Sequence, residues 1–421
     1  MTNTNDKSML RTRLSIQMYF QFAIWGSWAT VMFTHLRNIG FDAGQCGMIL
    51  STGPLALMVS PLIAGQIVDR YFSTERFLAF AYVCTGLCFY GASRLNSAEY
   101  TQMWMYMFGS MLFYGPTLGL GNSIVFHHVP NAAASFPAIR MLGTIGFICA
   151  AFMVSTVQSW FNIDLHACLY VATGLCALNA VYCLTLPHTP PAKRDALAAN
   201  SEPQGSATGK IFKLLRDPSF ALFTVIAFFM LVFATPYYFR TGDFFKTHLG
   251  MNDKQIGPVQ TIGQAAEILT MLALPLVYKF AGPKKTIALG LLAWTLRFVA
   301  FSIGSPAWLV VGAQSLHGAC FAFGIAAAMI YFDSICDSDA RGSMQSFLTW
   351  IAYGFGMFVG GAVAMPLMSK YSQIPDAANP GQTVLDWHTF WMIPAVGCFI
   401  LFVVFMIGFK ERPAQKRTEA A

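Results

Sequence analysis

Long apolar stretches recur along the whole of this chain, and they limit its possible folds more than any other feature. Each holds roughly 20 mostly apolar residues, the length that an α-helix needs to cross the ~30 Å hydrocarbon core of a bilayer. In hydrocarbon, backbone polar groups must be satisfied internally, which favours helices. We predict an all-α membrane protein with about twelve transmembrane helices, near residues 14–36, 47–68, 77–95, 102–125, 139–160, 165–187, 218–239, 257–279, 286–304, 307–332, 343–367 and 389–409.

The composition supports a lipid environment for most of the chain. Of 421 residues, 56% are hydrophobic and 11% are charged, whereas a soluble domain carries about 25% charged residues. The net charge of +7 does not indicate nucleic acid, because in a membrane protein the placement of the basic residues matters more than their sum. We therefore expect the protein to lie in the lipid bilayer and to bind no nucleic acid.

A polar segment divides the chain into two parts. Residues 188–216 are rich in Pro, Ala, Ser and charged residues, unlike the apolar stretches on either side. We predict an N-terminal six-helix half at 1–187, a cytoplasmic linker at 188–216, and a C-terminal six-helix half at 217–421 with a short cytoplasmic tail. The halves also resemble each other weakly, because residues 53–77 align with 263–287 without a gap. Parallel six-helix repeats are typical of the major facilitator fold, which binds its solute at the midplane between the halves.

The basic residues predict the orientation in the membrane. If both termini are cytoplasmic, 18 lysines and arginines lie on the cytoplasmic side and six on the opposite side. This is the expected positive-inside bias. We predict a multi-pass protein of the bacterial inner (cytoplasmic) membrane with both termini in the cytoplasm.

A charged turn follows the predicted second helix. Gly65, Asp69 and Arg70 resemble the loop signature of the major facilitator superfamily at this place. Gly65 permits close helix approach, and Asp69 is able to pair with basic neighbours as the halves move. The alternative is an ordinary solvated turn.

Ionisable residues inside apolar helices are costly, so each is a candidate for function. In the predicted fifth helix, Arg140, Thr144 and Phe147 have the spacing that places a cation, a hydroxyl and a ring on one face. The alternative is that Arg140 extends to the cytoplasmic surface. In the eighth helix, Gln264 and Glu267 share a face. A carboxylate there is a candidate proton carrier, and a static ion pair is the alternative.

Two further ionisable residues lie in the ninth and tenth predicted helices. We interpret Arg297 as structural, tied to an aspartate or to backbone carbonyls at a helix contact. His317 is a candidate for ligand contact or proton transfer, and a satisfied buried histidine is an equally good interpretation.

Sequence motifs for chemistry or for ATP hydrolysis are absent. The chain contains no G-x-S-x-G, H-E-x-x-H or Walker motif. We therefore expect a transporter and not an enzyme, without cofactor or metal, and with its energy drawn from an ion gradient or from the solute gradient.

Six segments carry a resemblance to a known family: QFAIWGSWAT, YGPTLGLGNSI, FPAIRMLGTIGFI, LTLPHTP, GQAAEILTMLALP and AWTLRF. In this order they are similar to the bacterial nucleoside:proton symporter family. The resemblance implies a nucleoside site between the halves, with Arg140, Thr144 and Phe147 from the first half and Gln264 and Glu267 from the second. It also implies that Phe321 stacks on the base.

The chain departs from the family pattern at four positions. An amide-bearing pair of the family falls on Thr235 and Tyr238, a tyrosine falls on His317, and the acidic residue after the stacking phenylalanine falls on Ala322. Hydroxyls in place of amides change which edges of a ligand are satisfied. The loss of the acidic residue removes one candidate proton site.

We predict a monomeric carrier that imports nucleosides with protons by alternating access. In this hypothesis Glu267 responds to protons and pairs with Arg140. The alternative within transport is a carrier of another small polar solute such as a sugar or glycoside. A transporter-like membrane sensor without net flux is a further alternative, against which the short polar tails argue.

Overall fold

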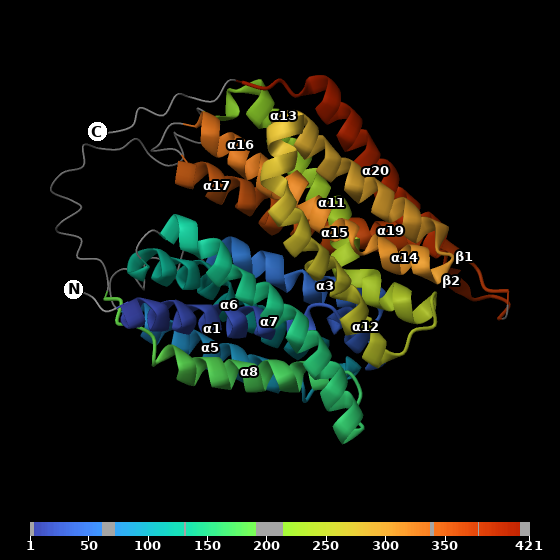
Figure 1. Ribbon diagram of the computed structural model, residues 1–421. Coiled ribbons are helices and arrows are strands. Elements are labelled where there is room, and N and C mark those ends of the chain that lie inside the picture. Colours follow the sequence, from blue (N-terminus) through green and yellow to red (C-terminus); the bar gives the residue numbers. More distant parts are fainter. Residues whose placement is uncertain are drawn as a thin grey trace. The chain divides into compact units, whose positions relative to one another are not determined.

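The structure is a computed structural model, and it describes residues 4–60, 72–129, 132–190, 214–336, 341–377 and 379–412. Helices dominate these residues (Figure 1). The α-helices are α1 (Thr4–Trp28), α2 (Met32–Asn38), α3 (Ala43–Leu50), α5 (Thr74–Ala92), α6 (Tyr100–His128), α7 (Ala132–Phe161), α8 (Ala167–Cys183), α11 (Pro218–Thr247), α12 (Asp253–Gln260), α13 (Ile262–Ile303), α14 (Ala307–Ala313), α15 (Leu316–Ala319), α16 (Ala327–Ile335), α17 (Arg341–Thr349), α18 (Met357–Val359), α19 (Met365–Tyr371) and α20 (Trp387–Gly408).

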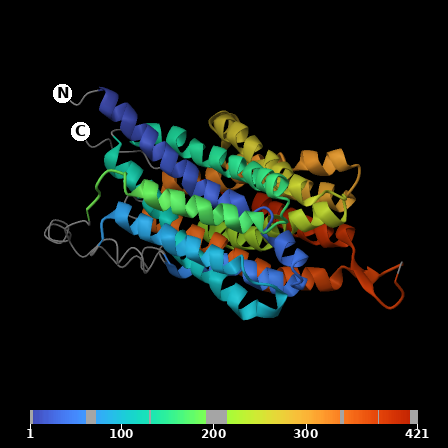
Figure 2. The same ribbon diagram turned by 90° about the horizontal axis from the view of Figure 1, so that it is seen from below.

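Shorter elements complete the described chain. A 3₁₀ turn, η1 (Ser97–Glu99), precedes α6. Three π-helical segments interrupt the later helices: η2 (Cys320–Ala326), η3 (Trp350–Gly356) and η4 (Gly360–Ala364). The strands β1 (Gln373–Pro375) and β2 (Thr383–Leu385) form an antiparallel pair with Ile374 opposite Val384. This hairpin extends beyond the ends of the neighbouring helices (Figure 2).

Contacts divide the chain into two compact units. The first unit comprises residues 1–201 and 237–261, and the second comprises 202–236 and 262–421. In the first unit, α1 packs on α7 and α8, and α5 packs on α6 and α8. In the second unit, α13 packs on α20, α15 and η2. The predicted division at the linker is based on repeats along the sequence, and it stays a prediction.

Most described residues of the predicted membrane helices are helical, with breaks such as residues 29–31 between α1 and α2 and residues 314–315 between α14 and α15. Six segments within the described residues are long and apolar enough to cross a membrane, judged by length and composition: Ala138–Phe161, Pro218–Thr247, Asp253–Ile303, Ala307–Ile335, Met344–Tyr371 and Trp387–Gly408. One of them contains two predicted helices, because Gly282 interrupts α13 with a φ of 75° and a ψ of 170°. A left-handed φ is readily adopted only by glycine, so the chain turns there.

Helices α1 and α11 extend well beyond the ends that hydropathy predicts. Helix α1 begins at Thr4, ten residues before the predicted start at 14, and α11 continues to Thr247 instead of ending at 239. Hydropathy detects only the lipid-compatible part of a helix, and polar turns extend both helices. In α11 the extension is stabilised by the buried ion pair between Arg240 Nη2 and Asp243 Oδ2, which are 2.6 Å apart.

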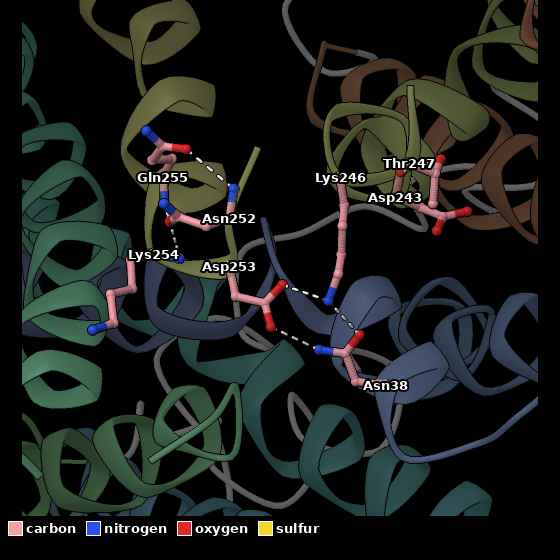
Figure 3. A network of polar contacts seen from close by, with 8 residues as sticks. All are labelled: Asn38, Asp243, Lys246, Thr247, Asn252, Asp253, Lys254 and Gln255. Atoms are coloured by element: carbon pink, nitrogen blue, oxygen red, sulfur yellow. Dashed lines mark hydrogen bonds and ion pairs between the residues drawn. The ribbon is translucent and has the colours of Figure 1, made fainter. Parts of the chain in front are cut away.

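The end of α11 and the whole of α12 pack on the other helices of the first unit. Lys246 Nζ lies 2.7 Å from Asp253 Oδ1 and donates to Asn38 Oδ1 at 2.8 Å. Asn38 Nδ2 donates to the other carboxylate oxygen of Asp253 at 2.9 Å. Figure 3 shows these three side chains converging on one another, while the side chain of Lys254 is directed away from them. We call Asn38, Lys246 and Asp253 the outer network, because the predicted topology places all three on the non-cytoplasmic side.

Two backbone contacts accompany the outer network. Gln260 Nε2 donates to the carbonyl oxygen of Thr30 at 2.6 Å, and Ser155 Oγ donates to that of Lys254 at 2.7 Å. The residues after Pro236 are therefore held to the first unit by hydrogen bonds to α7 and to the segment between α1 and α2.

Candidate functional site

Three predicted site residues lie on one face of α7 in the first unit. Arg140, Thr144 and Phe147 are all half-buried. The guanidinium carbon of Arg140 lies 3.6 Å from the centroid of the Phe22 ring on α1. This is a cation–π contact, and it holds the cation beside α1. The guanidinium group of Arg140 therefore lies against α1, and its functional role stays a prediction.

Two glycines bring α1 and α7 together beside Phe147. A Cβ atom at Gly146 would lie 2.2 Å from the carbonyl oxygen of Tyr19, and one at Gly26 would lie 2.3 Å from that of Phe147. Only glycine permits so close an approach of two backbones. The ring of Phe147 meets Trp25 edge-on, with centroids 6.1 Å apart. The aromatic face expected on α7 is thus continued by α1.

In the second unit, Gln264 and Glu267 occupy the first part of α13. Both side chains are half-buried, and that of Glu267 is 20% exposed. Within the part of the chain that the structure describes, Gln264 Oε1 is a buried acceptor without a hydrogen-bond partner. A buried acceptor of this kind is costly unless a donor reaches it. This face of α13 therefore carries an amide oxygen and a carboxyl group, both of which are able to accept hydrogen bonds.

His317 and Phe321 lie close together in the chain, on α15 and at the start of η2. His317 is buried, and its Nε2 lies 3.7 Å from Glu267 Oε2. Phe321 is half-buried and belongs to a π-helical segment, a feature that often occurs at functional sites. Ala322, where the family pattern has an acidic residue, is fully buried.

Thr235 and Tyr238 are placed differently from each other. The Thr235 hydroxyl is fully buried and donates to the carbonyl oxygen of Leu231 at 2.6 Å. A Cβ at Gly360 would lie 2.3 Å from this hydroxyl oxygen, so Thr235 packs tightly against η4. Tyr238 is half-buried beside Tyr237, and it belongs to the first unit whereas Thr235 belongs to the second.

The remaining predicted contacts are not tested by the structure. Gly65, Asp69 and Arg70, the proposed loop motif, lie outside the described residues. The expected pairing of Arg140 with Glu267 joins residues of different units and stays a prediction.

The structure reveals a polar cluster in the first unit that the sequence analysis missed. Gln17 Nε2 donates to Gln21 Oε1 at 2.7 Å, and the Tyr114 hydroxyl donates to the backbone oxygen of Gln21 at 2.7 Å. The Tyr82 hydroxyl lies 3.3 Å from Gln21 Oε1. The signal was available, because two glutamines four residues apart in an apolar helix share one face.

A contact of Arg297 was also missed. This residue is fully buried, with its guanidinium carbon 4.0 Å from the ring centroid of Trp294. Its Nη1 lies 3.4 Å from His317 Nδ1. Arg297 is therefore adjacent to a candidate site residue. No spacing in the sequence indicates this contact, because the two residues are 20 positions apart on different helices.

The described residues form long apolar helices with a few buried ionisable groups. Together with the solved structures that match them, they define this protein as a polytopic membrane transporter of the major facilitator fold. The crystal structure of nucleoside transporter NupG matches with a TM-score of 0.80 at 25% identity, covering 96% of this chain and 100% of that one. An inward-facing bacterial homologue of the human lysosomal transporter Spinster matches with a TM-score of 0.70 at 13% identity, covering 97% and 96%, which shows the fold alone.

Sequence comparison identifies the family. The family described as Nucleoside H+ symporter matches residues 9–414, so the chain belongs to it. The putative nucleoside transporter YegT of Escherichia coli K12 is 31% identical, covering 95% of this chain and 93% of its own length. The xanthosine permease of the same organism is 29% identical, covering 94% and 95%. The family resemblance proposed from the sequence is thereby confirmed.

Proposed function

We propose that this protein imports nucleosides across the bacterial inner membrane by proton symport. It does so as a monomer, through alternating access, with both termini in the cytoplasm. Membership of the Nucleoside H+ symporter family supports this function, as do relatives named for nucleoside and xanthosine transport. The observation that carries the proposal is on α13, where Gln264 Oε1, a buried acceptor without a hydrogen-bond partner among the described residues, lies one helical turn from the carboxyl group of Glu267. Ribose hydroxyls and base N–H groups are donors to amide and carboxylate oxygens.

Each predicted site residue has a role in this proposal. Phe147 and Phe321 contact the flat faces of the base, because aromatic rings stack on planar groups. Arg140 and Thr144 hydrogen-bond the acceptors of the base or sugar. Residues of the second unit, Gln264 and Glu267, accept from the ribose, and His317 lies beside Glu267. Thr235 and Tyr238 replace the amides of the family pattern and alter the choice of nucleoside.

The proton is proposed to bind to Glu267. A carboxyl group within an apolar helix is costly when charged, and exchange with a proton removes that cost. Proton binding then changes the balance between inward-open and outward-open states. The loop residues Gly65, Asp69 and Arg70 are proposed to assist this change at the cytoplasmic surface.

The substrate is tested by uptake into proteoliposomes. We expect an inward proton gradient to drive accumulation of radiolabelled uridine or adenosine, and unlabelled nucleosides to compete while free sugars do not. Competition by a sugar or glycoside, without competition by nucleosides, would favour the alternative substrate class. Binding without any counterflow would indicate a sensor instead of a carrier.

The role of Glu267 is tested by Glu267→Gln. The amide keeps the size of the side chain but does not titrate, so we expect pH-driven accumulation to be lost and counterflow of uridine to remain. A one-unit pH gradient coupled to one proton supports about tenfold accumulation, which is the signal that disappears. The control is Glu99→Gln, which changes a carboxylate at the N-terminus of α6 that accepts from the Asn96 backbone N–H. Accumulation by Glu267→Gln equal to that of this control would exclude Glu267 as the coupling site.

A further inference from the structure

A line of three polar side chains crosses the helices of the second unit. Arg297 on the later part of α13 contacts His317 on α15, and His317 in turn contacts Glu267 on the earlier part of α13. The two distances are 3.4 Å, from Arg297 Nη1 to His317 Nδ1, and 3.7 Å, from His317 Nε2 to Glu267 Oε2. The exposed fraction increases from 0% at Arg297 through 5% at His317 to 20% for the side chain of Glu267. A deeply buried cation is thus connected through one imidazole ring to the proposed proton-binding carboxyl group.

Packing fixes the positions of these groups. A Cβ atom at Gly263 would lie 2.9 Å from His317 Cβ, and one at Gly318 would lie 2.6 Å from the backbone oxygen of Ala266. The two glycines therefore bring α13 and α15 into backbone contact next to His317. Arg297 is held by the indole of Trp294. The His317 imidazole therefore has little freedom to move away from Arg297 and Glu267.

Hydrogen-bond chemistry selects one form of the imidazole. A guanidinium group has donors only, so His317 Nδ1 must offer its lone pair to Arg297. The neutral ring then carries its single proton on Nε2, which is the nitrogen that faces Glu267. A second proton on Nδ1 would point an N–H group at a cation and remove the only acceptor of the contact. His317 is therefore suited to donate to a carboxylate, and unsuited to carry the transported proton.

Other titratable groups near the line have lesser effects. Tyr353 of η3 interacts electrostatically with Glu267. Cys320 of η2 and Cys398 of α20 interact in the same way with Arg297. All three are neutral in their protonated forms, so Arg297 supplies the fixed charge among these groups of the second unit.

We propose that Arg297 and His317 are positioning residues that stabilise the carboxylate form of Glu267 and thereby set the pH at which it takes up a proton. This inference rests on the proposed function for the claim that the proton taken up is the transported one. When Glu267 is protonated, His317 Nε2 already carries a hydrogen and has no lone pair to accept from the new O–H group. The acid must then donate elsewhere, and Gln264 lies on the same face of α13. Proton uptake thus converts the Glu267 carboxylate, an acceptor that faces His317, into a carboxylic acid whose O–H group is able to donate to a substrate.

The test measures protonation of Glu267 directly, without a nucleoside. The carboxylic-acid infrared band of the purified protein is titrated with pH, and the Glu267→Gln variant identifies the band that belongs to this residue. We expect Arg297→Met and His317→Phe to move its midpoint to higher pH by about one unit, because the carboxylate loses a nearby cation or the imidazole N–H group that faces it. Arg297→Lys is expected to retain most of the wild-type midpoint.

A matched substitution separates positioning from proton transfer. The amide of His317→Gln is able to accept from Arg297 and donate to Glu267, yet it does not titrate. We expect this variant to keep the wild-type midpoint and the pH profile of uridine uptake. If His317→Gln loses proton-driven uptake while Glu267→Gln keeps it, His317 carries the proton and the inference is wrong.

The remaining outcomes are also decisive. A midpoint that is unchanged in folded Arg297→Met and His317→Phe proteins would overturn the inference, whatever the transport rates. Each variant is first checked for cooperative thermal unfolding in detergent, and His317→Asn, which is too short to reach both partners, replaces His317→Phe if that variant does not fold. If the midpoints shift as expected but the wild-type protein moves no nucleoside, the proposed substrate fails and the inference about Glu267 stands.

Discussion

Two arginines of this chain are almost equally buried but have different surroundings. Arg240 is 5% exposed and pairs with Asp243 of the same helix at 2.6 Å, whereas Arg297 is 0% exposed and contacts His317 of another helix. A buried ion pair within one helix neutralises its own charge. Arg297 instead lies next to His317, which faces Glu267, the residue that is proposed to change its protonation state. Burial of a charge alone therefore does not identify function, and the partner decides its role.

At the same scale, the carboxylate of Asp386 at the start of α20 predicts a pH effect on stability. It accepts from the backbone N–H groups of His388 and Thr389, both at 3.1 Å. Burial raises the pKa of Asp386, but the hydrogen bonds from Thr389 and His388 outweigh this and leave the pKa below its usual value. A lowered pKa means that the carboxylate stabilises the fold above its ordinary pKa of about 3.9, and that this stability is lost as the pH falls through the folded-state value.

Substitution of the same residue tests this effect. We expect Asp386→Ala to lower stability at pH 7 by about 1 kcal/mol, the usual value of a helix N-cap. Asp386→Asn keeps a good cap but does not titrate, so its stability should depend less on pH as the pH falls below about 4. The measurement is thermal unfolding in detergent, followed by tryptophan fluorescence. An equal pH dependence in the wild-type protein and in Asp386→Asn would contradict the assignment.

At the scale of elements, hydropathy predicts where helices lie but not where they end or which helices touch. The start of α1 at Thr4 and the end of α11 at Thr247 lie beyond the apolar stretches. Polar turns continue a helix when their charges are paired, as for Arg240 and Asp243, and this pairing is not part of a hydropathy signal. The shared face of Gln264 and Glu267, in contrast, follows from helical periodicity and was predictable.

The contact between α1 and α7 predicts opposite effects for two glycine substitutions. Gly146→Ala should destabilise the protein by about 1–3 kcal/mol, because a methyl group there overlaps the backbone of Tyr19. It should also weaken uridine binding, since the adjacent Phe147 is displaced. Gly174→Ala in α8 is the control, because a Cβ atom there has nothing within 4 Å. The higher helix propensity of alanine should raise stability in the control by about 0.5–1 kcal/mol. Equal unfolding temperatures for the two variants would refute the close contact.

At the scale of the whole molecule, the proposed transport cycle requires contacts that form and break. The outer network of Asn38, Lys246 and Asp253 holds the end of α11 and the start of α12 to α2 (Figure 3). In the proposed cycle, an opening on the non-cytoplasmic side loosens residues 237–261 from the other helices of the first unit. The network is therefore expected to contribute to the balance between the two states.

Hydrogen exchange of residues 237–261 tests this role. Lys246→Met removes one ion pair and one hydrogen bond, and we expect exchange there to accelerate by up to about fivefold. The effect is modest because the side chains of Lys246 and Asp253 are 35% and 23% exposed, and exposed ion pairs contribute at most about 1 kcal/mol. Lys254→Met is the matched control, since it removes the same charge eight residues away without touching the network. Similar exchange in both variants would show that the network does not hold this end closed.

The sequence by itself determined the class of this protein. Hydropathy, the linker and helical periodicity are local properties, and they were sufficient to predict membrane helices, the fold and the polar faces that bear Arg140 and Glu267. Only the tertiary structure decided which side chains meet across helices: Arg140 with Phe22, and Arg297 with His317 and thereby with Glu267. The physical reason is that helix contacts depend on backbone approach, here at Gly146 and at Gly263 and Gly318, and such approach is a property of two helices packed together.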